Sequence, residues 1–140
     1  MAEREPHVLV VAHRTAATPR LLQEVSRRAR AGRCRMTLLV PRPYWDPDTD
    51  EAQVVVELAV PLLERAALGH IDAMIGDSDP VEAVRHVMET TQVDAVIIST
   101  LPQRVSRWLH RDVPSRVQAL GVPVTVVTAE QSARALIGHG

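Results

Sequence analysis

The sequence predicts an α/β fold in three layers, a sandwich in which a five-stranded parallel sheet is flanked by helices on both faces. Short, unbroken runs of aliphatic residues alternate strictly with longer amphipathic segments, as expected when helices connect parallel strands. The aliphatic runs lack the polar–apolar alternation of half-exposed strands, so both faces of the sheet should be covered. A chain of 140 residues fits one domain with one main site.

The predicted elements follow one another from the N-terminus. Thr18 followed by Pro19 is a good helix N-cap with proline in the first helical position, and Gly32 offers a stop for that helix. The five aliphatic runs predicted as strands are His7–Val11, Met36–Val40, His70–Ile75, Val93–Ser99 and Val122–Val127.

A long second helix is expected between Asp50, as its N-cap, and Gly69, with Pro61 kinking it. Its core-facing residues are predicted to be Val54, Val55, Leu58, Leu62, Leu63 and Ala66. The proline-rich loop before it carries Tyr44 and Trp45, which are expected either to cover a ligand site or a partner surface, or to pack beneath this helix.

Two further helices complete the pattern. Asp79-Pro80-Val81-Glu82 has the arrangement of a capping box, and Asp112 to Leu120 is the fourth main helix. We expect residues 1–128 to form the domain and residues 129–140 a C-terminal tail of uncertain order.

Composition excludes several classes of function. The formal net charge is -1 and the aromatic residues are one Tyr and two Trp, which argues against nucleic acid and membrane surfaces as partners. All 16 basic residues are arginine, so mechanisms that need a lysine are excluded. A single cysteine and a polar N-terminus without a signal-peptide pattern make the cytoplasm the expected location.

Sequence patterns of catalysis are also missing. The sequence contains no GxSxG, P-loop, HExxH or GxGxxG motif. The six histidines have no metal-ligand spacing, so no metal is expected. No combination of nucleophile, base and orienting group can be assembled, and the sequence therefore predicts a protein that is not an enzyme.

The order of elements resembles the universal stress protein family. The resemblance spans nearly the whole chain and is carried by Gly76-Asp77, the segment Pro80 to Val84, and the ending from Val113 through Gly121-Val122-Pro123 to Val127. It implies an adenine nucleotide alpha hydrolase-like fold with a five-stranded parallel sheet. It also implies a homodimer formed through the last strand, and many members of the family bind ATP.

The chain departs from the nucleotide-binding members at their key positions. Those members resemble one another in a G-x-x-G stretch after the fourth strand and a Gly-Ser or Gly-Thr pair at the start of the last helix. Here Thr100 or Leu101 and Gln103 or Arg104 replace the two glycines, and Arg111-Asp112 replaces the pair. Glycine lets the backbone approach a phosphate closely, so no nucleotide cofactor is expected in the usual family manner.

Two residue substitutions add to this expectation. The aspartate that usually ends the first strand near the adenosine is replaced by His13. Asp112, as the N-cap of the last helix, is expected to direct its carboxylate onto the free N–H groups where a phosphate would bind.

An arginine cluster favours the opposite expectation, that an anionic ligand binds. If Gln103–Arg111 is helical, Arg104, Arg107 and Arg111 share one face. In a parallel α/β sheet, ligands bind at the carboxyl ends of the strands, near the reversal of strand order. The candidate ligand-binding residues at this edge are His13, Arg14, Thr15, Thr100, Arg104, Arg107, Arg111 and Asp112.

Two interpretations of the arginines remain open. They form either a solvated surface that Asp112 partly neutralises, or a site for a small anion or an acidic protein partner. The leading hypothesis is a homodimeric, non-catalytic stress-response module without ATP. The alternative is a module that binds ATP or another adenine nucleotide through the arginines in place of the glycine loop.

Overall fold

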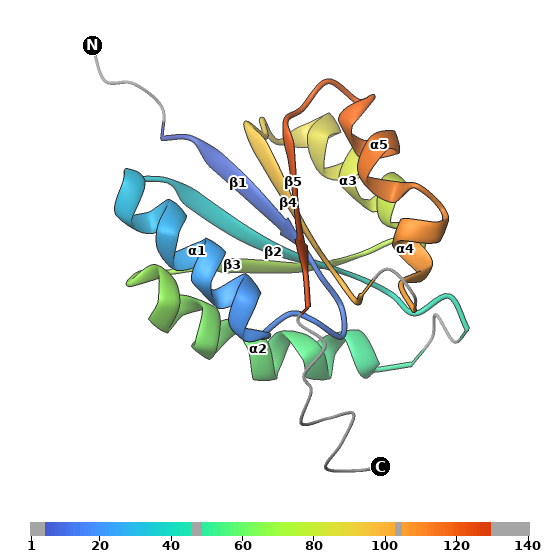
Figure 1. Ribbon diagram of the computed structural model, residues 1–140, viewed down its shortest axis with the longest axis horizontal. Coiled ribbons are helices and arrows are strands. Elements are labelled where there is room, and N and C mark those ends of the chain that lie inside the picture. The colour runs from blue at the N-terminus through green and yellow to red at the C-terminus, as the bar shows by residue number, and fades with distance from the viewer. Residues whose placement is uncertain (1–4, 46–48, 103–104, 130–140) are drawn as a thin grey trace.

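A parallel sheet of five strands forms the middle layer of the protein (Figure 1). The computed structural model describes residues 5–45, 49–102 and 105–129. The strands are β1 (His7–Val11), β2 (Arg35–Pro41), β3 (Asp72–Gly76), β4 (Ala95–Thr100) and β5 (Val124–Thr128). Their order in the sheet is β3-β2-β1-β4-β5, so β3 and β5 are its edges.

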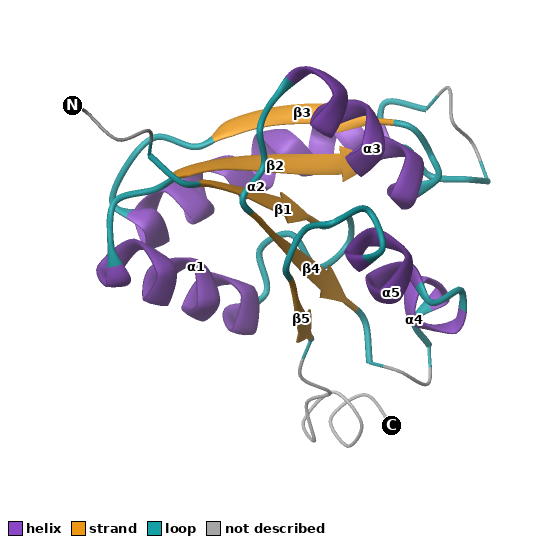
Figure 2. Cartoon of the chain, turned by 90° about the horizontal axis from the view of Figure 1, so that it is seen from above, coloured by secondary structure: helices purple, strands orange, loops and turns teal. Residues whose placement is uncertain are grey.

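Helices cover both faces of the sheet, as Figure 2 shows. On one face lie α1 (Pro19–Ala31) and α2 (Glu51–Ala67). On the other lie α3 (Pro80–Thr90) and the two short helices α4 (Arg107–His110) and α5 (Val113–Gln118). None of the helices in the described part of the chain is both long enough and apolar enough to cross a membrane.

Each face of the sheet has its own hydrophobic cluster. Val8 and Val10 of β1 pack with the residues under α1 and α2, whereas Leu9 and Val11 pack with those under α3 and α5. All five residues of β1 are buried. The unbroken aliphatic runs thus form strands covered on both sides, and the predicted three-layer α/β fold is confirmed.

The limits of several elements differ slightly from the prediction. The ladder of β5 begins at Val124 instead of Val122, because Val122 is a buried residue of the preceding turn and Pro123 has no N–H to donate. The helix α2 ends at Ala67, and its C-cap is Leu68, one residue before the predicted stop at Gly69, in the left-handed conformation at φ 57°. The condition that Gln103–Arg111 is helical is not met, since among its described residues only Arg107–His110 form a helix and residues 103–104 lie outside the described residues.

Half of the predicted core face of α2 was wrong: Leu63 is buried and Val55 and Ala66 pack against the core, but Val54, Leu58 and Leu62 are exposed. The buried residues of the helix are Ala52, Ala59 and Leu63. Apolar residues surround most of this helix, so the sequence period does not select one face. The two alanines face the sheet because small side chains allow the helix to approach closely.

Candidate functional site

The reversal of strand order lies between β1 and β4, because β1 continues to β2 and β3 on one side while β4 and β5 lie on the other. The loops that leave these two strands separate there and leave room for a ligand. A cavity of about 430 Å³ opens at this point. Its walls come from residues 13–15 after β1, residues 41–45 after β2, Ser78, and residues between 99 and 108.

Buried hydroxyl groups connect the loop after β1 to strand β4 beside the cavity. The Thr15 and Ser99 hydroxyl oxygens are 2.7 Å apart, and the Ser99 hydroxyl also donates to the Thr15 carbonyl at 3.2 Å. At the far wall, the Ser106 hydroxyl accepts a hydrogen bond from the Leu109 N–H and caps α4. These hydroxyls hold the loops in place, and their hydrogen-bonding capacity is largely used within the protein.

Tyr44 and Trp45 form an aromatic wall beside the cavity. Their rings meet edge to face with centroids 5.0 Å apart, and about half of each side chain is exposed. The Arg107 guanidinium carbon lies 3.8 Å from the Tyr44 ring centroid, and that of Arg14 lies 5.0 Å from the Trp45 centroid. Neither aromatic residue belongs to a core cluster, so of the two expectations for this loop the structure favours the one that places it at the site.

The cavity is electropositive. Arg14, Arg42 and Arg107 line it, and none of the described residues that line it is acidic. The Glu51 carboxylate lies close to His13, with its Oε1 3.8 Å from the His13 Nε2. An anion entering this space would meet three guanidinium groups, which are well suited to bind carboxylate or phosphate oxygens.

His13 stands at the inner edge of the site with an unused polar atom. Its buried Nε2 has no hydrogen-bond partner among the described residues. Burial lowers the pKa of His13 and Arg14 lowers it further, while Glu51 acts in the opposite direction. His13 is therefore neutral near pH 7, and its Nε2 is available to a ligand.

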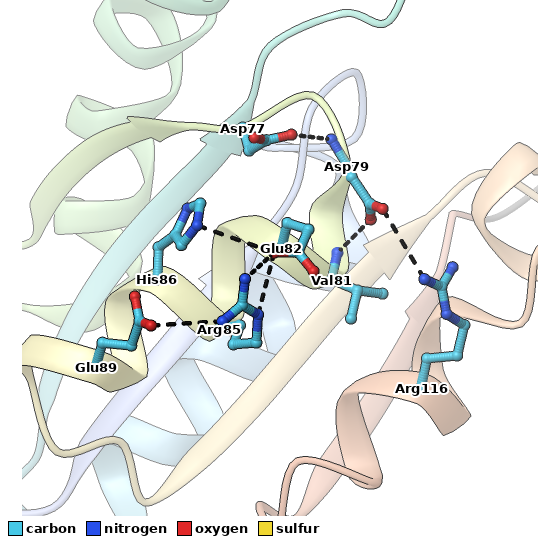
Figure 3. Close-up of polar contacts among 8 residues, drawn as sticks. All are labelled: Asp77, Asp79, Val81, Glu82, Arg85, His86, Glu89 and Arg116. Atoms are coloured by element: carbon cyan, nitrogen blue, oxygen red, sulfur yellow. Dashed lines mark hydrogen bonds and ion pairs between the residues drawn. The ribbon is translucent and has the colours of Figure 1, made fainter.

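The turn before α3 carries Ser78, which lines the cavity, and polar contacts of its two aspartates join it to α3 and α5 (Figure 3). The Asp77 carboxylate accepts from the Asp79 N–H, and the Asp79 carboxylate accepts from the Val81 N–H, both at 2.9 Å. The other Asp79 oxygen lies 3.9 Å from the Arg116 guanidinium of α5.

Half of the predicted capping box is wrong. Asp79 caps α3 as expected, but the Glu82 carboxylate pairs with Arg85 instead of returning to the N-cap N–H (Figure 3). The Asp77 carboxylate takes over that role because it lies two residues before the cap.

The structure brings together half of the eight predicted ligand residues. His13, Arg14, Thr15 and Arg107 line the cavity. Thr100 is buried beside it without lining it, and its hydroxyl has no hydrogen-bond partner among the described residues. Arg111 is an exposed residue at the end of α4 that does not line the cavity, and Arg104 lies outside the described residues.

The predicted capping role of Asp112 was wrong. Asp112 stands before α5, but it has a left-handed backbone at φ 57° and its carboxylate makes no capping hydrogen bond. Its backbone is used instead: the N–H donates to Leu109 and the carbonyl accepts from Arg116. Two short helices meet at this residue, and its left-handed backbone differs from the extended conformation that a capping aspartate normally adopts.

Two cavity residues, Arg42 and Ser78, lie in loops that the sequence places at this edge of the sheet, Pro41 to Asp46 and Gly76 to Ser78, but they were not among the eight candidate ligand residues. Both follow strands whose carboxyl ends reach the same edge of the sheet, Arg42 after β2 and Ser78 after β3. Their positions shortly after predicted strands are the sequence signal by which they could have been chosen.

Together, the sheet and its cavity define a parallel α/β protein with a ligand-sized pocket at the switch point. Three of the solved structures similar to this chain are universal stress proteins. One from Archaeoglobus fulgidus superposes with a TM-score of 0.65 at 15% identity, over 87% of this chain and 93% of that one. The same organism's protein in complex with dAMP gives 0.64 at 15% identity, over 89% and 98%.

A third similar structure is a universal stress protein in complex with cAMP. Its TM-score is 0.61 at 16% identity, and the match covers 91% of this chain and 100% of that one. No protein-family model matches the sequence, and no curated protein sequence matches it either. The chain thus has the universal stress protein fold, which confirms at the level of fold the resemblance seen in the sequence.

Proposed function

We propose that this chain is a non-catalytic, cytoplasmic binding module whose switch-point pocket holds a small anionic ligand through arginine side chains. The observation that carries the proposal is the convergence of Arg14, Arg42 and Arg107 on a cavity of about 430 Å³ without an acidic lining residue among those described. Guanidinium groups bind phosphate and carboxylate in two-pronged geometry, which gives both affinity and orientation.

A phosphate-bearing molecule with a planar ring suits this pocket. Two of the similar universal stress proteins were solved with dAMP and with cAMP, each of which carries one phosphate. The arginines provide partners for such a phosphate, and Tyr44 and Trp45 provide ring surfaces.

The pocket offers fewer backbone N–H groups to a triphosphate such as ATP than a glycine-rich loop would. The segment after β4 carries no glycine, and Pro102 within it has no N–H to offer. A nest of backbone N–H groups for successive phosphates is therefore incomplete, so ATP should bind no more tightly than AMP.

The polar groups of the pocket support a binding role over a catalytic one. The Thr15 and Ser99 hydroxyls bond to each other, and the His13 Nε2 has no hydrogen-bond partner among the described residues. A hydrolase would need a nucleophile within hydrogen-bond reach of its base.

Titration calorimetry with sulfate, phosphate, AMP, cAMP and ATP tests this function. We expect binding of AMP or cAMP that weakens when Arg14 or Arg107 is replaced by alanine. Arg65→Ala is the matched control, because Arg65 is an exposed arginine on α2 outside the pocket. Tight ATP binding, or equal losses from all three substitutions, would refute the proposal.

We further propose a homodimer that forms through β5. This strand is an edge of the sheet, its residues are only partly buried, and 41% of Val126 is exposed. An exposed apolar edge is an aggregation liability unless it is paired. Light scattering should give a dimer at micromolar concentration and a monomer after Val126→Lys; a monomeric wild-type protein would contradict the assignment.

A further inference from the structure

The outer face of α2 carries a ridge of exposed apolar side chains. Val54, Leu58 and Leu62 are 49%, 70% and 40% exposed. They are four residues apart and therefore form one continuous row along the helix. Because Ala52, Ala59 and Leu63 face the sheet, this row points away from the core, and α2 forms the lower margin of the described chain in Figure 1.

Opposite charges flank the ridge symmetrically. Glu51 precedes Val54 by three residues, and Arg65 follows Leu62 by three. The Glu51 side chain is 37% exposed, and Arg65 is exposed without an ion-pair partner among the described residues. Positions 51, 54, 58, 62 and 65 are thus arranged symmetrically about Leu58, acidic at one end and basic at the other.

We propose that this ridge binds the same ridge of a second copy of the chain, with the two α2 helices antiparallel about a two-fold axis at Leu58. Leu58 then packs on the partner's Leu58, Val54 packs on the partner's Leu62, and Glu51 pairs with the partner's Arg65. A two-fold interface needs a surface that is complementary to itself. This row meets that requirement, because its apolar residues and its opposite charges are placed symmetrically about Leu58.

The charges select the antiparallel arrangement. Parallel helices in register would place Glu51 beside the partner's Glu51 and Arg65 beside the partner's Arg65, and like charges at contact distance are unfavourable. An unrelated apolar partner would gain nothing from opposite charges set at equal distances from the centre.

The contact should be weak and independent of the β5 edge. A helix of 17 residues is about 25 Å long, so one helix pair covers less than a standard interface of roughly 1,600 Å². The helix α2 contacts β2 and β3, on the side of the sheet away from β5. Both surfaces can therefore be occupied at once, and dimers should associate further at high protein concentration.

Disulfide trapping tests the register. In a Cys34→Ala background, which removes the natural thiol, Leu58→Cys should form a cross-linked dimer under mild oxidation because the two cysteines face each other at the axis. Val54→Cys alone should not, since the two copies would be about 12 Å apart along the helices, beyond the reach of a disulfide. Mixing Val54→Cys with Leu62→Cys should restore cross-linking.

Gln53→Cys is the matched control, because Gln53 is exposed on the same helix and lies off the ridge. Cross-linking of Leu58→Cys no faster than that of Gln53→Cys would overturn the proposal. So would preferential self-linking of Val54→Cys, which needs another register.

Charge reversal gives a second test in sedimentation velocity. The test uses the Val126→Lys protein, in which the proposed β5 dimer is blocked. In this protein Arg65→Glu should weaken association several-fold, and the double change Glu51→Arg with Arg65→Glu should restore it. Because Glu51 also faces His13, a thermal melt of each variant must show that the fold is retained. Failure of the double variant to recover, with the fold intact, would contradict the pairing of Glu51 with the partner's Arg65.

Discussion

Replacing Arg107 by alanine should weaken the binding of AMP about 10- to 30-fold. Arg107 lines the cavity and its guanidinium lies over the Tyr44 ring at 3.8 Å. A hydrogen bond to a charged group contributes about 1.5–3 kcal/mol, and the lower part of that range applies because Arg107 is exposed to solvent and salt. About 1.5–2 kcal/mol corresponds to the stated change in affinity.

The same substitution should have a small effect on stability. A cation–π contact at an exposed site contributes about 0.5–1 kcal/mol, so the Tm should fall by about 1–4 °C. Arg107→Lys keeps the charge but loses the planar group, and it should retain part of the affinity.

Calorimetric titrations at one fixed ionic strength distinguish a specific contact of Arg107 with AMP from a general effect of the charge of the molecule. Wild type, Arg107→Ala, Arg107→Lys and the control Arg65→Ala should be compared with the same AMP stock. Unchanged affinity in Arg107→Ala would refute the assignment of this side chain to the ligand. A loss of the same size in Arg65→Ala would show that the general charge of the molecule, and not the pocket, attracts the anion.

Three further predictions concern stability. Leu68→Gly should raise the free energy of unfolding by about 0.5–1 kcal/mol, because Leu68 is left-handed at φ 57° and 84% exposed, and a lower Tm would contradict this. Gly76→Ala should lower it by about 1–3 kcal/mol, since a Cβ there would lie 2.9 Å from the Ala83 Cβ and 3.0 Å from the Leu39 Cδ1; an unchanged urea midpoint would disprove this crowding. His13 has a lowered pKa in the folded protein, so its unfolded form binds more protons, and the stability that depends on it is full above about pH 6.5 and lost as the pH falls. Between pH 7.5 and 5.5, the Tm should therefore fall less for His13→Gln than for wild type. An equal fall of the Tm in both proteins would exclude this role for His13.

The fold was predictable because the strands carry a strong signal. The run His7–Val11 matches β1 residue for residue, since buried parallel strands need aliphatic side chains on both faces. Asp79-Pro80 likewise marked the start of α3, because the cap and the proline both act locally.

The site was predictable only where local sequence decides position. His13, Arg14 and Thr15 follow directly from the end of β1, and the structure places all three at the cavity. The role of Asp112 depended on a backbone angle in a turn between two short helices, which no propensity of aspartate specifies.

Tertiary packing determined the remaining features. The exposed face of α2 could not be read from the sequence, because apolar residues occur around most of that helix and the sheet selects the side with Ala52 and Ala59. Arg42 reaches the pocket because β2 and β1 are neighbours in the sheet, which is a matter of strand order.

Intrinsic fluorescence tests most directly the central claim, that an anionic ligand binds in the switch-point pocket through its arginines. The two tryptophans of the chain, Trp45 and Trp108, both line this cavity. A titration of AMP should give a saturable change in tryptophan emission that gives the same Kd as calorimetry. The change should be lost in the double variant Arg14→Ala, Arg107→Ala and kept in Arg65→Ala. Calorimetric binding of AMP without any change in emission, or with the change intact in the double variant, would contradict an arginine-based anion site in this pocket.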